Sequence, residues 1–192
     1  MNFSELVKKN RSYRRFREEE RISGEQLEQW IGLSRFIPSG RNNQPLKYTG
    51  SVNPELNAGI FQLLAWAGYL TGWAGPAEGE RPAAYIVVMH DKSISENRYC
   101  DDGIAVQTIL LGAVEDGYGG CIIGSVNKAK LAALLQLPQH LEILWVIALG
   151  KPAETVVIED MKHDDVKYWR DENQIHHVPK RALNQLIWSI IP

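Results

Sequence analysis

The segment that most constrains the fold runs from Asp101 to about Val114. After two aspartates, its side chains are apolar at nearly every position rather than along one face. A helix of this kind lies in a protein core or along a subunit interface. A chain of 192 residues has little room for it in its own core alone, so the segment predicts a homodimer.

Two other runs, residues 83–90 (AAYIVVMH) and 142–149 (EILWVIAL), are typical of fully buried strands. Capping residues and hydrophobic periodicity predict helices elsewhere in the chain. The expected helices cover Ser4 to Lys9, Gly24 to Phe36, Asn53 to about Trp66, and Asn127 to about Gln136, and shorter strands are expected at 47–51 and 121–124. These elements predict the α+β class.

No glycine-rich linker divides the chain, so one domain covering residues 1–192 is predicted. Residues 67–82 mix glycines and prolines with aromatic residues, which favours a lid or a pocket wall over a regular element. Residues 153–192 are expected to form an extended C-terminal arm. Its end, 183–191, is too apolar to be left in water, and this favours packing on another subunit.

Charge and hydropathy exclude several classes. The formal net charge of −2 excludes a globally basic nucleic-acid binder, and no apolar run approaches the length of a membrane span. The first ten residues lack the apolar core of a signal peptide, which predicts a cytoplasmic protein. No strand is followed by GxGxxG, and neither a Walker A segment nor a GxSxG elbow is present.

Histidines raise the question of a metal site. Two groups could be considered as metal ligands: His163 with the following Asp164 and Asp165, and the pair His176–His177. Adjacent side chains point in different directions on an extended chain, so neither group makes a chelate alone. We expect surface histidines and no metal.

The loop Pro38–Pro45 (PSGRNNQP) carries hydrogen-bonding side chains on a backbone that can bend. Such a loop suits the edge of a flat heterocycle, although a plain polar surface loop is the simpler alternative.

A second cluster, Arg11–Arg17, holds four arginines and is followed by three glutamates. Opposed charge blocks usually form a solvated face. The functional alternative is a phosphate site built from Arg forks and the Ser12 hydroxyl. An RNA-binding patch is a weaker hypothesis, because the acidic triplet would repel the same backbone.

Five segments in order resemble the nitroreductase family. They are Arg11–Phe16 (RSYRRF), Pro38–Pro45 (PSGRNNQP), Asp101–Gln107 (DDGIAVQ), Gly119–Gly124 (GGCIIG) and Val178–Arg181 (VPKR). They span almost the whole chain. The chain departs from the family pattern at Asn10, Leu46, Thr108 and Lys151.

The resemblance implies an FMN-dependent oxidoreductase that takes a hydride from NAD(P)H and passes it to an electron-poor acceptor such as a nitroaromatic or a quinone. It implies an antiparallel-rich central sheet surrounded by helices, in an intertwined homodimer whose C-terminal arm packs on the partner. The flavin carries the chemistry, so no catalytic residue is assigned. The residues that would bind FMN are Arg11, Ser12, Arg14, Pro38, Ser39, Asn42, Gln44, Ile122, Ile123, Gly124, Lys180 and Arg181.

Two alternatives stay open. A flavoenzyme of the same fold can run another reaction, such as substrate dehydrogenation, enone reduction or reductive dehalogenation. A protein of a different class, a non-catalytic binder of flavin, would carry the same motifs without turnover.

Overall fold

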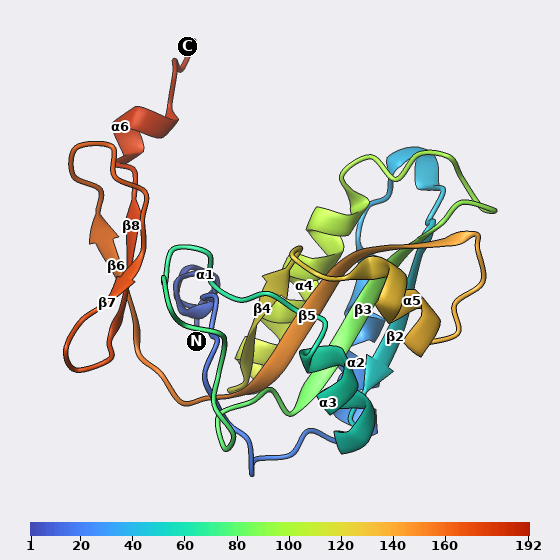
Figure 1. Ribbon diagram of the computed structural model, residues 1–192. Helices are drawn as coiled ribbons and strands as arrows, with labels where there is room; N and C mark the ends of the chain where they lie inside the picture. Colours follow the sequence, from blue (N-terminus) through green and yellow to red (C-terminus); the bar gives the residue numbers. More distant parts are fainter.

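A central sheet organises the molecule, and the computed structural model describes residues 1–192 (Figure 1). Its strands follow the order β1-β5-β3-β2, and β4 also pairs with β5 on the side away from β3. Every pairing in this sheet is antiparallel. The strands are β1 (Phe16–Arg17), β2 (Leu46–Ser51), β3 (Ala84–Asp91), β4 (Gly119–Ile123) and β5 (Leu141–Pro152). The predicted α+β class and antiparallel-rich sheet are confirmed.

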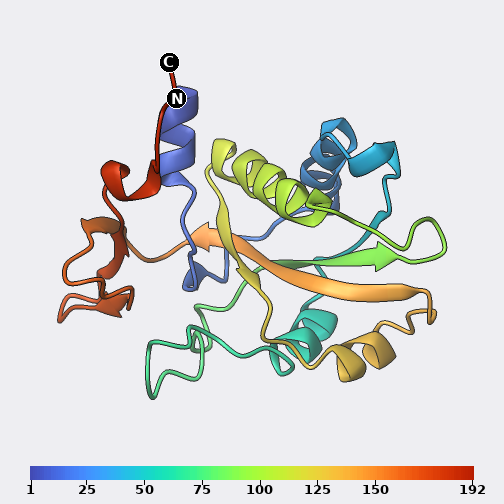
Figure 2. The ribbon, with the colours of Figure 1, turned by 90° about the horizontal axis from the view of Figure 1, so that it is seen from above.

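Helices cover both faces of the sheet, as Figure 2 shows from above. α2 (Gly24–Leu33) and α4 (Asp101–Glu115) lie on one face, and α3 (Pro54–Phe61) and α5 (Lys128–Leu134) on the other. Every residue of β3 is buried, because side chains of alternating direction enter two cores. Ile86 and Val88 join the first core, and Tyr85 and Val87 join the second. This explains why residues 84–89 of the strand are apolar at every position and do not alternate with polar ones.

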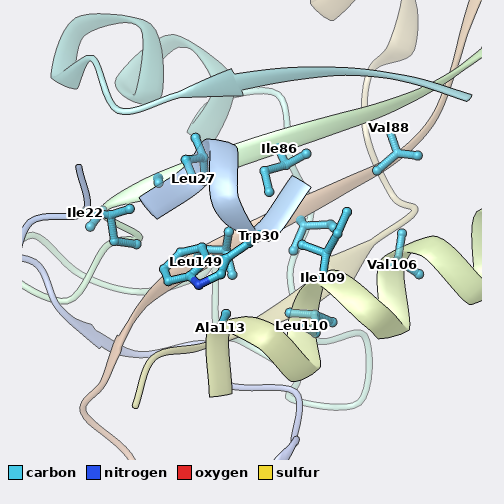
Figure 3. Packing of buried hydrophobic residues seen from close by; sticks show 13 residues of the cluster. Ile22, Leu27, Trp30, Ile86, Val88, Val106, Ile109, Leu110, Ala113 and Leu149 are labelled. Carbon is cyan, nitrogen blue, oxygen red and sulfur yellow. The ribbon is translucent and has the colours of Figure 1, made fainter. Parts of the chain in front are cut away.

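The first core lies between the sheet and α2 with α4 (Figure 3). Trp30 of α2 is 2% exposed and faces the apolar side of α4. Its indole Nε1 donates a hydrogen bond of 2.7 Å to Asp116, just beyond the end of α4. The indole therefore fixes the two helices to each other without leaving a buried N–H unpaired.

α4 buries most of its apolar surface within its own chain. Val106, Ile109, Leu110 and Ala113 belong to the first core, and only a narrow side of the helix stays accessible. The all-round apolar composition is thus largely accounted for by the monomer. The predicted homodimer must rest on other features.

Helix starts follow local capping signals. Ser23 and Gln26 form the predicted capping box of α2, and Asn53 and Asn127 cap α3 and α5 as expected. The first helix, α1 (Phe3–Lys9), is capped by Asn2 and not by Ser4, because Asn2 and Glu5 form a capping box.

Two helices end earlier than predicted. The α-helical part of the second ends at Leu33 and continues as a 3₁₀ turn, η1 (Ser34–Phe36). α3 ends at Phe61 instead of Trp66, since the chain leaves the helix to pair with residues 125–126: Ala65 donates to the Ser125 carbonyl at 2.8 Å, and Leu64 bridges Val126. Tertiary pairing here replaces helical hydrogen bonds.

Residues after Pro152 are more ordered than the extended tail that was predicted. They form a separate sheet of β6 (Val156–Asp160), β8 (His176–Lys180) and β7 (Trp169–Arg170), in which β6 and β8 are parallel. This small sheet lies on the same side of the molecule as α1 in both ribbon views. A single helical turn, α6 (Leu183–Leu186), follows it, and Trp188 beyond that turn is 99% exposed.

Residues 67–82 form turns without a helix or strand, as their composition predicts. Side chains from the middle and from the end of the segment contact the rest of the chain. Trp73 packs edge-on against Trp66, with ring centroids 6.4 Å apart, and Glu80 forms an ion pair with Arg15.

No helix in the structure combines the length and hydropathy that crossing a bilayer requires.

A first prediction concerns the contact between β4 and β5. A Cβ added at Gly120 would overlap the backbone carbonyl oxygen of Ala148, which the sheet holds in place. We expect Gly120→Ala to lower the free energy of unfolding by about 1–3 kcal/mol. The matched control is Gly103→Ala on α4, where a Cβ meets nothing within 4 Å and should cost nothing. Urea unfolding of both variants tests this, and equal midpoints would contradict it.

Candidate functional site

The segment that follows α1 is held against β4 by its backbone. Ser12 forms a β-bridge with Gly120, and the Tyr13 amide donates to the Gly120 carbonyl at 3.1 Å. These contacts place the two backbones side by side. Residues 11–14 therefore run along the free edge of β4.

Glu154 joins this segment to the arm. Its carboxylate accepts hydrogen bonds from the backbone amides of Arg14 and Arg15 and from Arg170 of β7 at 2.9 Å. The side chain is 1% exposed. A buried carboxylate with three donors is satisfied, so it fixes the arm and the arginine segment relative to each other.

The four arginines of the cluster divide into two pairs. Arg15 forms an ion pair with Glu80, and Arg17 lies 3.8 Å from Glu20. Arg11 and Arg14 have no carboxylate within ion-pair distance, and neither has Lys180 of β8. Three cations thus remain without an anionic partner.

These three cations line one cavity of about 320 Å³. None of its lining residues is acidic. Arg11 and Arg14 come from the segment after α1, and Lys180 comes from the far end of the chain. The full lining is Asn10, Arg11, Ser12, Arg14, Gln107, Leu110, Gly120, Cys121, Ile122, Val156, Tyr168, His176, Val178 and Lys180. An acid-free cavity with three unpaired cations is suited to a dianion.

Arg14 stands where this cavity meets a second one of about 190 Å³. The second cavity is lined by the end of β4, residues 121–125, and by residues 65–68. Cys121 borders both cavities, and burial raises the pKa of its thiol to about 12. It is therefore a neutral wall residue and not a nucleophile.

The Arg14 side chain is held by neutral groups. Its Nη1 donates to the Ser12 carbonyl and contacts His176 Nε2, each at 3.3 Å, and the guanidinium lies 5.0 Å from the centroid of the Tyr168 ring. Tyr168 in turn packs against Tyr69, with ring centroids 5.0 Å apart. The arm and residues 67–82 both reach this cation.

The residues predicted to bind one ligand occupy separate places. Arg11, Ser12, Arg14, Ile122 and Lys180 line the first cavity, and Ile122, Ile123 and Gly124 line the second. Ser39 and Gln44 line a third cavity of about 180 Å³ that shares no residue with the other two, and Pro38 and Asn42 belong to the same loop. Arg181 lines none of these cavities and pairs with Asp164 at 2.6 Å.

The loop 38–45 is nevertheless rigid. Asp101, 2% exposed, accepts hydrogen bonds from the Ser39 hydroxyl at 2.6 Å and the Gly40 amide at 2.9 Å. The same hydroxyl accepts from the Gln44 amide at 2.9 Å. Arg41, Asn42 and Gln44 have positive φ, which this network maintains. The loop leads into β2, three strands away from β4, or about 14 Å across the sheet.

Sequence patterns missed Glu154, Tyr168 and His176 as residues of this region. His176 was expected at the surface, and that expectation is wrong: the residue is 0% exposed, in the central strand of the small sheet. The neighbouring aromatic and histidine residues were visible in the sequence, but nothing local indicates which side of the strand is covered.

Comparisons with known proteins agree with the resemblance found in the sequence. The family model described as "Nitroreductase family" matches residues 72–151. A nitroreductase family protein from Clostridium novyi NT is 27% identical, with a TM-score of 0.66, over 79% of this chain and 86% of that one. The resemblance to the nitroreductase family is confirmed.

Other solved structures support the nitroreductase fold. An FMN-dependent nitroreductase from Clostridium difficile R20291 is 21% identical, with a TM-score of 0.64, over 83% of this chain and 91% of that one. An NADPH:FMN oxidoreductase from Vibrio harveyi, complexed with NAD+, is 24% identical, with a TM-score of 0.63, over 79% of this chain and 69% of that one.

A second prediction uses the opposite pKa shifts of two adjacent histidines in this nitroreductase fold. Burial, followed by the charges of Arg14 and Arg170, lowers the pKa of His176 from 6.5 to about 4. Between these values the unfolded chain binds a proton that the folded one lacks, so stability falls as pH drops from 6.5 to 4, by up to about 3 kcal/mol. Urea midpoints at pH 7 and pH 5 should therefore differ less in His176→Gln than in the unmodified protein.

His177 provides the control of opposite sign. Its hydrogen bond with Glu159 and then the Asp171 carboxylate raise its pKa. The stabilisation from His177 is complete below the unfolded pKa and is lost as pH rises through the folded pKa. His177→Gln should therefore lower the free energy of unfolding more at pH 6 than at pH 9. The same pH profile in both variants would contradict the assignment.

Proposed function

We propose that the chain is an FMN-dependent NAD(P)H oxidoreductase. The observation that carries the proposal is the cavity at which Arg11, Arg14 and Lys180 meet without any carboxylate. The structural neighbours described as FMN-dependent nitroreductase and NADPH:FMN oxidoreductase support a flavin oxidoreductase. The proposed reaction is a ping-pong transfer of hydride from NAD(P)H to an electron-poor acceptor such as a nitroaromatic or a quinone.

The donor set of the first cavity fits the phosphate of FMN. Arg11 and Lys180 supply charge, and the Ser12 hydroxyl supplies a neutral hydrogen bond. The buried Nε of Arg11 has no hydrogen-bond partner in the chain, so a donor is left for a ligand oxygen. Arg181 would join this set only if its ion pair with Asp164 opened.

Arg14 and the end of β4 fit the ring. Bound FMN would supply hydride transfer at its N5 atom, so no protein acid or base is required and no catalytic residue is assigned. A fixed cation such as Arg14 at the pyrimidine edge would stabilise the negative charge of a reduced ring. The amides of Ile123 and Gly124, beside the second cavity, are candidates for contacts near N5.

The remaining predicted residues require a second subunit. Pro38, Ser39, Asn42 and Gln44 lie on the rigid loop at the opposite edge of the sheet from β4, so one chain does not bring them to the cation-lined cavity. We propose that this loop enters the cavity of the partner in a homodimer, and that the arm, 153–192, packs on that partner. Exposed apolar residues of the arm support this: Leu183, Leu186, Trp188, Ile190 and Ile191 are each at least 67% exposed.

Residues 67–82 are proposed as a wall of the substrate pocket. Trp66, Ala67 and Gly68 line the second cavity, where an acceptor would meet the ring. The contacts of Trp73 and Tyr69 with Arg170 and Tyr168 connect this wall to the arm. Acceptor specificity would then depend on both segments.

An absorbance spectrum tests the proposed function. We expect flavin bands in the purified protein, or after FMN is added, that bleach when NADPH or NADH is supplied without oxygen. Bands that persist with both nucleotides but bleach with dithionite would identify a flavin binder or another electron donor. The absence of any flavin, even with added FMN, would overturn the proposal.

Complementation tests the shared site. Two double variants are needed, Arg11→Ala with Lys180→Ala and Ser39→Ala with Gln44→Ala. The homodimer of each double variant should lose most of its FMN, because both of its sites lack one of the two sets of residues. Unfolding and refolding the two variants together should restore flavin, because one of the two sites in each mixed dimer has all its residues. Each variant refolded alone is the control. Equal flavin contents in the mixed and separate samples would contradict a site built from two chains.

A further inference from the structure

His176 has a fixed position at the wall of the cation-lined cavity. It begins β8, between β6 and β7, and its backbone amide donates to the Thr155 carbonyl at 2.8 Å. The Tyr168 ring packs on its imidazole, with ring centroids 5.2 Å apart. The backbone and one face of the ring are therefore both held in place.

The contact with Arg14 determines which nitrogen carries the proton. A guanidinium can only donate hydrogen bonds, so His176 Nε2, 3.3 Å from Arg14 Nη1, is the acceptor. The lowered pKa of His176 keeps the ring neutral at ordinary pH. In a neutral imidazole whose Nε2 accepts, Nδ1 bears the hydrogen.

That Nδ1–H has no partner. The atom is buried, and no protein group accepts a hydrogen bond from it. An unsatisfied buried donor is costly and therefore needs an explanation. His176 lines the same cavity as Arg11, Ser12 and Lys180, and none of the residues that line it carries a carboxylate.

We propose that His176 is a ligand-binding residue: its Nδ1–H donates a hydrogen bond to a phosphate oxygen of the bound flavin nucleotide, while its Nε2 holds Arg14. This rests on the proposed function. The imidazole then links the phosphate end of the ligand to the cation that faces the ring. A neutral donor adds a directed hydrogen bond without placing a fourth charge among three cations.

Two substitutions separate the nitrogens. Asn ends at the δ position, where its NH₂ replaces Nδ1–H but leaves Arg14 without its acceptor. Gln reaches the ε position, where its carbonyl replaces Nε2 but the δ donor is lost. We expect His176→Gln to weaken FMN binding by about 10- to 100-fold, as for a lost hydrogen bond to a charged group, and His176→Asn to weaken it by less.

Riboflavin, which lacks the phosphate, is the matched ligand. Its affinity, measured by flavin fluorescence, should be at least as high in His176→Gln as in His176→Asn, because Gln keeps an acceptor for Arg14 and riboflavin has no phosphate contact to lose. Thermal melts of both variants report whether each is folded. If the two variants bind FMN equally, or if riboflavin discriminates between them as FMN does, the phosphate contact is wrong.

Nitrogen-15 NMR of the histidine rings tests the unmodified protein and does not depend on variants that fold. Without ligand, His176 should show a protonated Nδ1 and an unprotonated Nε2. Added FMN or inorganic phosphate should shift the Nδ1–H signal, and riboflavin should leave it in place. A signal indifferent to FMN and phosphate would mean that a trapped water satisfies Nδ1, and would overturn the proposal.

These outcomes separate the two proposals. If the unmodified protein binds neither FMN nor riboflavin, the proposed function fails. If it binds FMN tightly while the substitutions and the NMR signal show no phosphate contact, the flavin assignment stands and the role of His176 fails.

Discussion

The buried carboxylate of Glu154 is the contact on which the candidate site depends. It accepts hydrogen bonds from two backbone amides of the arginine segment and from the guanidinium of Arg170. One side chain therefore connects residue 14 to the small sheet of the arm. Removing one partner from such a group leaves an uncompensated buried charge, which costs far more than the net value of the pair. The cavity exists because this contact brings the two ends of the chain together: Arg11 and Arg14 are on one wall, and His176 and Lys180 on the other.

The central sheet positions the wall that the end of β4 forms. β4 ends beside the second cavity, and its register with β5 is fixed by five residue pairs, from Gly119 with Gly150 to Ile123 with Val146. Gly120 lets β5 lie close to β4, since a side chain there would overlap Ala148, and Ser12 bridges Gly120 from the free edge of β4. The core thus determines the geometry of the site: β5 and α4 hold β4, and β4 holds the segment that carries the cations.

Much of the fold could be predicted because its signals are local. Ser23, Asn53 and Asn127 cap helices through hydrogen bonds to residues three positions later, and β3 and β5 are buried on both faces. The rest depends on distant partners. β1 has two residues and forms only against the end of β5, and β6 pairs with β8 across the intervening hairpin. His176 and Glu154 gain their importance from Arg14, more than 100 residues earlier. No pattern within either segment records that contact.

Charge explains why a chain with a net charge of −2 can still offer an anion site. The arginine cluster and the glutamates after it do not form one solvated, self-neutralised face. Glu18 accepts from the amides of Gly79 and Arg81, and Glu80 neutralises Arg15, so these two carboxylates hold residues 79–81 against the cluster. Arg11 and Arg14 are left without a carboxylate partner, and Lys180 joins them at the same cavity. Because electrostatic interactions weaken within about 10 Å in salt, this local separation of charge, and not the total, decides what the cavity attracts.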